Sequence, residues 1–181
     1  MFHSNTHRLI DMWAALARGG RTPSRGAIDP GDFGPLLPQV FMLGRQHRGA
    51  YRVRLAGGFV GELHRRDLRG VNALELWSAR DRLRLQTALE ELRRRPEPLV
   101  VLAEALTDGP SLSLEVLLAP LAPHDGGPER YLGFYQPLGL VHRLDGRPAL
   151  ELSVRALRRP GAANEETPPV RLATVHGLRI A

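Results

Sequence analysis

The stretch that decides the fold runs from Pro23 to Gly70 and reads PSRGAIDPGDFGPLLPQVFMLGRQHRGAYRVRLAGGFVGELHRRDLRG. Within it, Asp29-Pro30 is a helix cap followed by a first-turn proline, so we predict a short helical turn near 30–36. The run from Val40 to Leu43 is apolar, which is typical of a strand. The stretch holds no reactive group of the kind that catalysis requires.

A second strand is predicted from Tyr51 to Leu55, because its apolar side chains alternate with arginines and leave one polar face. Gly57-Gly58 breaks this strand. Short helices are then predicted over 59–64 and 71–77. This order of elements suits a sensor-type domain better than an enzyme core.

The second half of the domain reads as one helix followed by three strands. Ser78-Ala79-Arg80-Asp81 has the form of a capping box and predicts a longer helix that ends before Pro96. Alternation and turn signals then predict strands over 99–106, 112–118 and 131–137. Together with the first two strands they predict an α+β fold with a five-stranded antiparallel sheet and helices on one face.

An amphipathic helix is predicted within residues 1–20. Its apolar stripe must cover either the domain's own sheet or a second copy of the chain, and the sequence leaves both open. For the second case, a homodimer, the candidate interface residues are Leu9, Met12, Trp13 and Leu16.

Residues 139–181 are predicted to be a C-terminal extension of the central domain, which spans 21–138. Residues 150–157 fit the alternation of a strand and the spacing of a helix equally well, so both remain open. Residues 160–169 are linker-like in composition, and we expect the extension to be partly flexible.

Composition excludes several kinds of chemistry. The chain has 181 residues, no cysteine, and 25 basic residues that are all arginine. Thiolate metal sites, cysteine nucleophiles and lysine Schiff bases are therefore ruled out. The net charge of +6 allows an acidic partner, but the arginines are scattered, and Glu90 and Glu91 stand four residues before Arg94 and Arg95, as in a salt-bridged surface. No run is long enough to span a membrane, and we expect a cytoplasmic protein.

Three motifs resemble functional sites, and each is better explained by structure. Ala56-x-Gly58-x-x-Gly61 follows a strand like a dinucleotide fingerprint, but a tight turn that needs positive φ is favoured. His3, His7 and Asp11 are spaced like metal ligands at a helix end that we expect to be frayed. His64 lies where a cavity would open, but an exposed helix-end histidine is favoured. We predict no catalytic residue, no metal and no cofactor.

The apolar positions of the strands and helices are the better candidates for a site. They would line either a ligand pocket between the sheet and the helices or a filled core without a ligand. The candidate pocket residues are Val53, Leu55, Phe59, Leu63, Leu76, Val101, Leu114, Val116, Leu132 and Phe134.

An ordered set of short motifs over roughly 9–138 resembles the PAS superfamily and, within it, bacterial proteins with one short PAS domain. The motifs are a helix with Trp13, Pro23 with Arg25, Ile28-Asp29-Pro30, Leu36-Leu37-Pro38, Arg52-Val53-Arg54-Leu55-Ala56-Gly57 and Arg66-Asp67-Leu68-Arg69-Gly70. The family often has glycine where His64 or Arg65 stands, so the helix before this loop is expected to sit differently here.

The resemblance implies a PAS fold, a sensory or regulatory role, dimerisation through the helix before the sheet, and no catalysis. We therefore expect a non-enzymatic module that acts through contacts with itself and with a signalling protein, and that a small apolar ligand could tune. The alternative is an Arg-rich nucleic-acid-binding protein. The scarcity of aromatic residues near the arginines disfavours this alternative.

Overall fold

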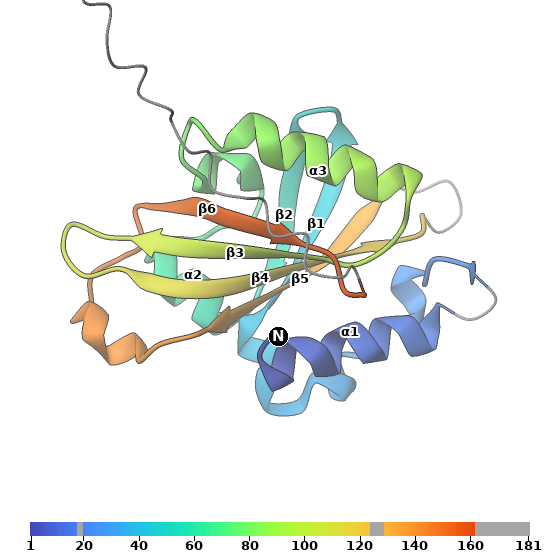
Figure 1. Ribbon diagram of the computed structural model, residues 1–181, viewed down its shortest axis with the longest axis horizontal. Helices are drawn as coiled ribbons and strands as arrows, with labels where there is room; N and C mark the ends of the chain where they lie inside the picture. Colours follow the sequence, from blue (N-terminus) through green and yellow to red (C-terminus); the bar gives the residue numbers. More distant parts are fainter. Residues whose placement is uncertain (18–19, 124–128, 162–181) are drawn as a thin grey trace, which may run out of the picture.

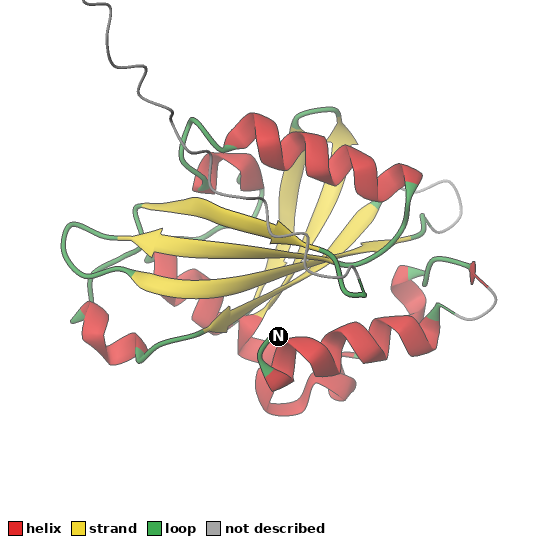
Figure 2. Cartoon of the chain, in the orientation of Figure 1, coloured by secondary structure: helices red, strands yellow, loops and turns green. Residues whose placement is uncertain are grey.

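A computed structural model describes residues 1–17, 20–123 and 129–161. One antiparallel sheet forms its centre, and helices lie on both sides of it (Figures 1 and 2). In chain order the α-helices (α), 3-10 helices (η) and strands (β) are α1 Ser4–Leu16, η2 Arg25–Ala27, η3 Pro30–Gln39, β1 Val40–His47, β2 Ala50–Ala56, α2 Gly58–His64, η4 Ala73–Leu76, α3 Arg82–Arg94, β3 Leu99–Leu106, β4 Leu112–Leu121, β5 Arg130–Pro137, η5 Val141–Leu144 and β6 Glu151–Arg158.

The strand order is β2-β1-β5-β4-β3-β6, and every neighbouring pair is antiparallel. The predicted α+β class and antiparallel sheet are confirmed. The predicted number of five strands is wrong, because the C-terminal extension supplies a sixth. Its strand β6 pairs with β3, with Leu152 opposite Ala105 and Val154 opposite Ala103. This pairing decides between the strand and the helix that the sequence of 150–157 left open.

The sheet has an apolar core on each face. On the inner face, α2, η4 and α3 cover residues such as Tyr51, Val101 and Leu114. On the outer face, α1 and η3 cover residues such as Leu117 and Phe134. Because both faces are buried, alternate residues of one strand belong to two different cores.

The helix α1 is seated on the outer face by its apolar stripe and by polar contacts, two of which reach β4. The Trp13 indole Nε1 donates to the Pro120 carbonyl of β4 at 2.8 Å. At the other end, the His3 backbone N–H lies 3.1 Å from both carboxylate oxygens of the buried Glu115. The ring of His3 caps the helix by accepting from the Asn5 backbone N–H. The N-terminal helix is thus packed on the domain's own sheet.

A β-bulge at Arg54 breaks the alternation in β2. Met42 of β1 faces Leu55, but the next residue, Leu43, faces Val53, so Arg54 is the extra residue. Leu55 therefore points to the outer face and Val53 to the inner face. The Arg54 side chain lies over Gly44, where a Cβ would stand 2.7 Å from its Nε.

The two edges of the sheet are covered by the segment between α2 and α3. Val53 of β2 exchanges hydrogen bonds with the backbone of Gly70 and Val71. At the other edge, the Asp81 carboxylate accepts from the Ser78 hydroxyl at 2.7 Å and from the Val154 backbone N–H of β6 at 2.9 Å. Burial raises the pKa of Asp81, but these hydrogen bonds outweigh it and lower the pKa. Asp81 therefore ties β6 to the domain instead of closing the predicted capping box.

Two glycines are required by close approach. A Cβ on Gly57 would overlap the backbone of Leu37 and Pro38, and the φ of Gly57 is −67°. The predicted tight turn is therefore present, but its reason is close packing rather than positive φ. A Cβ on Gly133 of β5 would overlap the ring of Phe41, which lies across this glycine from β1.

We predict that Gly133→Ala destabilises the protein by about 1–3 kcal/mol, because the methyl group displaces the Phe41 ring within a packed core. Thermal or urea unfolding measures the loss. Gly139→Ala is the matched control, since its Cβ would lie at an ordinary 3.5 Å from Leu112. Equal stability of the two variants would contradict this account of Gly133.

Candidate functional site

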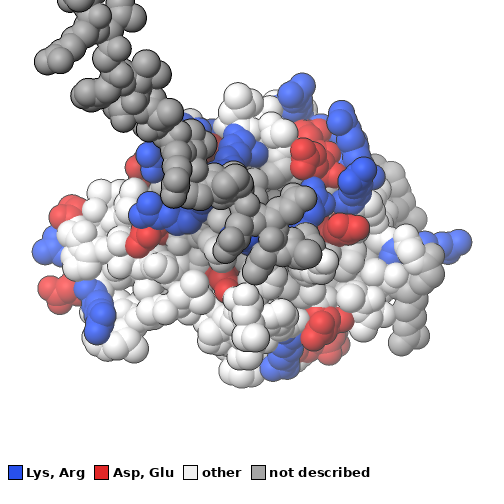
Figure 3. Space-filling view, viewed as in Figure 1, with Lys and Arg blue, Asp and Glu red and all other residues white. Residues whose placement is uncertain are grey.

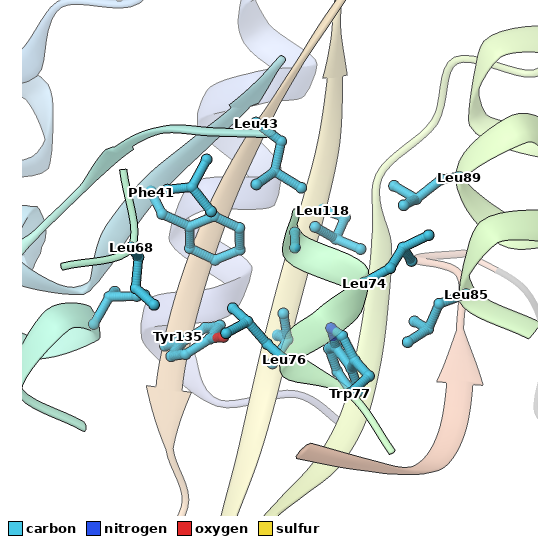
Figure 4. A pocket seen from close by; sticks show the side chains of 14 residues that line it. Phe41, Leu43, Leu68, Leu74, Leu76, Trp77, Leu85, Leu89, Leu118 and Tyr135 are labelled. Carbon is cyan, nitrogen blue, oxygen red and sulfur yellow. The ribbon is translucent and has the colours of Figure 1, made fainter. Parts of the chain in front are cut away.

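The inner core leaves one cavity between the sheet, η4 and α3. Its volume is about 30 Å³, and its walls are almost entirely apolar. Figure 4 shows the labelled side chains converging on this space from the sheet and from the helices. A water needs about 10–15 Å³, whereas ligand pockets measure about 300–1,000 Å³. The cavity has room for a water or two and none for an organic cofactor.

The structure brings some of the predicted pocket residues to this cavity. Val53, Leu76 and Val116 line it. Leu63, Val101 and Leu114 belong to the same inner core without lining the cavity, and Phe59 lies half-buried at its margin, beside η5.

The prediction is wrong for Leu55, Leu132 and Phe134. Leu55 is turned to the outer face by the bulge at Arg54, where it is 50% exposed. Leu132 and Phe134 belong to the outer core. In β5 the inward positions are those of Tyr131 and Tyr135, because Tyr135 stands opposite Val116.

The lining residues that sequence reasoning missed include every aromatic side chain of the cavity. Phe41, Trp77 and Tyr135 line the cavity, and the Phe41 and Tyr135 rings meet edge to face with centroids 5.1 Å apart. The pairing of β4 with β5 would have identified Tyr135. The sequence of β5 alone could not, because both of its alternating sets of positions hold large apolar or aromatic residues. These rings fill space that a ligand would otherwise occupy.

His64 is a buried polar residue that contacts Tyr135, one of the residues lining this cavity. It ends α2 and is only 6% exposed, so the predicted exposed histidine is wrong. Its ring nitrogens lie 3.3 Å from the Ala149 carbonyl and 3.4 Å from the Tyr135 hydroxyl. Burial lowers the pKa of His64 to about 4; the hydrogen bond to Ala149 opposes the shift and the charge of Arg66 adds to it. At neutral pH the imidazole is therefore uncharged.

A charged network holds α3 on the sheet. The Arg45 guanidinium lies 2.9 Å from the Glu90 carboxylate, which also accepts from the Tyr51 hydroxyl. Burial raises the pKa of Glu90, but hydrogen bonds from Arg45 and Tyr51 outweigh it and hold the pKa at about 2. The Arg93 guanidinium lies 3.3 Å from the Glu90 carboxylate and 2.7 Å from the Glu129 carboxylate, and so links the two. Every member has a partner, so the network is structural.

The structure also places the candidate dimer-interface residues. Leu9 and Trp13 are buried against the domain's own sheet, at 1% and 6% exposure. Met12 and Leu16 are only half-buried at the margin of the outer core. Of the four, these two alone retain surface for a second copy.

The remaining motifs do not assemble a reactive site. In the part of the chain that the structure describes, no group of three or more metal-binding side chains occurs, and no helix is long and apolar enough to cross a membrane. Several arginines are paired with acids, and the charges alternate over the surface seen in Figure 3. The partners differ from those predicted: Glu91 pairs with Arg159 at 3.2 Å.

Comparison with known proteins identifies the family. The family model described as PAS domain matches residues 1–136, which is most of the chain, so the chain belongs to the PAS domain family. The strand β6 lies beyond the matched residues. No curated protein matches the chain.

Solved structures that resemble the chain include light-oxygen-voltage (LOV) proteins. The Rhodobacter sphaeroides LOV protein is 13% identical, with 80% of this chain and 72% of that chain covered and a TM-score of 0.45. The LOV domain of the blue-light photoreceptor Aureochrome1 is 12% identical, with 58% and 78% covered and a TM-score of 0.44. At these values the neighbours carry no argument about ligands, and the family match supports a sensory PAS domain.

We predict that Val116→Trp destabilises the protein by about 1–3 kcal/mol, because a cavity of about 30 Å³ has no space for an indole ring. For a chain of this size each kcal/mol lowers Tm by roughly 2–4 °C. Leu83→Trp on the exposed side of α3, where Leu83 is 68% exposed, is the control. An unchanged Tm for Val116→Trp would mean that the interior is open to a ligand.

We predict that stability falls as the pH falls from about 6.5 to 4. Over this range the unfolded chain protonates its residue-64 imidazole, whose pKa is then 6.5, while the folded chain, with a pKa of about 4, does not. The unfolded state is thereby favoured by up to about 3 kcal/mol. Urea unfolding at several pH values measures the effect.

His64→Gln should flatten this pH dependence, because glutamine can hydrogen-bond but does not titrate. His142→Gln, at an exposed histidine, should leave it unchanged. Protonation of Glu90 also lowers the stability, but this loss occurs below its ordinary pKa of 4.5 and can be separated from the effect of His64. A pH dependence that survives in His64→Gln would show that another group is responsible.

Proposed function

We propose that this chain is a non-enzymatic PAS regulatory module that acts through protein contacts in the cytoplasm. The observation that carries the proposal is the closed inner core, whose cavity of about 30 Å³ is far below the size of a cofactor site. A module with no room for an internal cofactor must pass on a signal through its surface.

Exposed apolar side chains support this reading. Leu138, Leu140, Val141 and Leu150 are between 39% and 65% exposed, and all lie in the connector between β5 and β6. This connector follows the residues that match the PAS family model. Apolar side chains gathered on a surface favour contact with another protein. We propose that the connector contacts the signalling partner.

We propose further that the chain forms a homodimer through the side of α1 that the sheet leaves uncovered. Met12 and Leu16 lie on this side, and both remain half-exposed in the single chain. A second copy would bury them, while Leu9 and Trp13 would keep their place on the sheet.

The double variant Met12→Glu/Leu16→Glu tests this arrangement. We expect the full-length chain to be a dimer in size-exclusion chromatography with light scattering, and the variant to be a monomer with unchanged circular dichroism. Ala14→Glu should remain dimeric, because 3.6 residues per turn place exposed Ala14 roughly opposite Met12 and Leu16 around the helix axis. A wild-type chain that is monomeric at every concentration would remove the dimer from the proposal.

A further inference from the structure

The outer face holds a second and much larger hollow. It is an open groove of about 410 Å³ between the sheet and η2–η3. Its floor is formed by Val40, Met42, Leu55 and Leu132, and its wall includes Phe33 and Leu37. The volume is within the range of about 300–1,000 Å³ that small-molecule sites occupy. In Figure 1 the light blue segment beside α1 is η3, which overhangs this side of the sheet.

The groove exposes apolar side chains to water. Leu55 is 50% exposed and Leu37 is 41% exposed, although both lie beside a buried core. Leu55 is there only because of the bulge at Arg54, which turned it away from the inner core. Covering such surface is favourable by about 25 cal/mol for each Å² removed from water. The groove floor therefore suits an apolar chain.

Three arginines lie near one end of the groove, around Gly44 of β1. Two residues beyond Met42 along β1 stands Gly44, with Arg52 opposite it on β2 and Arg130 opposite it on β5. Because Gly44 has no side chain, the side chain of Arg54 lies across this position. The row of Gly44 is about 7 Å beyond the row of Met42.

Arg25 brings a fourth cation to the same end. It lines the groove from η2. Its neighbour Ser24 forms a β-bridge with Ala122. Ala122 directly follows Leu121, which stands opposite Arg130 of β5. The side chains of Arg25 and Arg54 form no hydrogen bond or ion pair with any other described residue. Neither Asp29, which caps η3, nor Asp32 within it lines the groove, and the Asp29 carboxylate accepts from the Gly31 backbone N–H.

We propose that this groove binds a single-chain amphipathic anion, such as a fatty acid. Its alkyl chain lies on the apolar floor, and its carboxylate or phosphate head lies at the Gly44 end with Arg54 and Arg25. The ligand enters from the outer face and needs no space in the closed inner core. The binding does not depend on the identity of the signalling partner, so its failure would leave the proposed function standing.

Charge argues against the other occupants of the groove. A symmetric second copy placed there would bring its own Arg54 and Arg25 against the same cations. The chain's own last segment, 170–181, carries Arg171 and Arg179, so it would also bring positive charge to the groove. An anionic head group instead gains charge-assisted hydrogen bonds from arginines that have no acid partner among the described residues.

An NMR titration of the full-length, ¹⁵N-labelled chain with dodecanoate tests the proposal. We expect the backbone amides of Leu55, Gly57 and Gly58 to shift, and those of Leu74 and Leu85 in the inner core to stay. Dodecanol has the same chain without the charge and should bind at least tenfold more weakly. Dodecyl phosphate should bind in the same place, and its affinity relative to dodecanoate distinguishes the two head groups.

Two groove variants test the head group and the alkyl chain of the ligand separately. Arg54→Glu should weaken dodecanoate binding about ten- to a hundredfold, because a hydrogen bond to a charged group contributes about 1.5–3 kcal/mol. Leu55→Ser should weaken both dodecanoate and dodecanol several-fold. The matched controls are Arg84→Glu and Leu83→Ser on the exposed side of α3, across the sheet from the groove, and they should bind like the wild type.

Several results would overturn the proposal. They are the absence of shifts with dodecanoate, shifts in the inner core instead of the groove, or equal affinities for dodecanoate and dodecanol. Groove amides that shift on dilution of the ligand-free protein would assign the groove to a second copy. Groove amides that shift in Leu178→Ser without ligand would assign it to the chain's own C-terminal segment.

Discussion

The structure depends on a sheet whose central strands supply two cores at once. In β1, Phe41 and Leu43 point into the inner core, whereas Val40 and Met42 point into the outer core. A shift of one residue in register would exchange the two sets, so the register must be fixed at particular places. The contact of the Phe41 ring with Gly133 is one of them, because a Cβ at position 133 would overlap the ring.

The position of α1 follows from the same constraint. An outer face as apolar as the inner one cannot be left in water, and α1 covers it over β4 and β5. The Trp13 indole and the His3 N–H satisfy polar groups of β4 at the two ends of the helix. The negative Glu115 lies at the N-terminal end of α1, where the helix dipole favours it.

The sequence predicted most of the secondary structure, because the strands carry their signal locally. Leu112, Leu114 and Val116 alternate with Ser113 and Glu115, and the structure has a strand there. The N-terminal helix and α3 were equally clear from their apolar stripes. The family was also within reach, because the ordered motifs of residues 9–138 lie in the segment that the PAS family model matches.

The side of the sheet to which each strand residue points was less predictable, for two physical reasons. In β5, Tyr131 and Tyr135 are as apolar as Leu132 and Phe134, so alternation cannot tell inward from outward. In β2, the bulge at Arg54 inserts a residue, and a strict period of two then misplaces Leu55. Both orientations are determined by pairing with strands that are distant in the sequence. A local sequence pattern does not contain this information. The same holds for β6, whose partner β3 and anchor Asp81 lie far from it in the chain.

The bulge also links the closed interior to the open outer face. By turning Leu55 outward it removes this side chain from the inner core and adds it to the apolar floor of the groove. The groove wall residue Phe33 belongs to the same outer core as Leu9 and Trp13 of α1, and Arg8 of α1 donates to the Asp32 carbonyl of η3 at 3.2 Å. A molecule held in the groove would therefore press on the core that seats α1. Close-packed cores transmit such displacements, so a ligand bound in the groove would act on the helix through the outer face rather than through the interior.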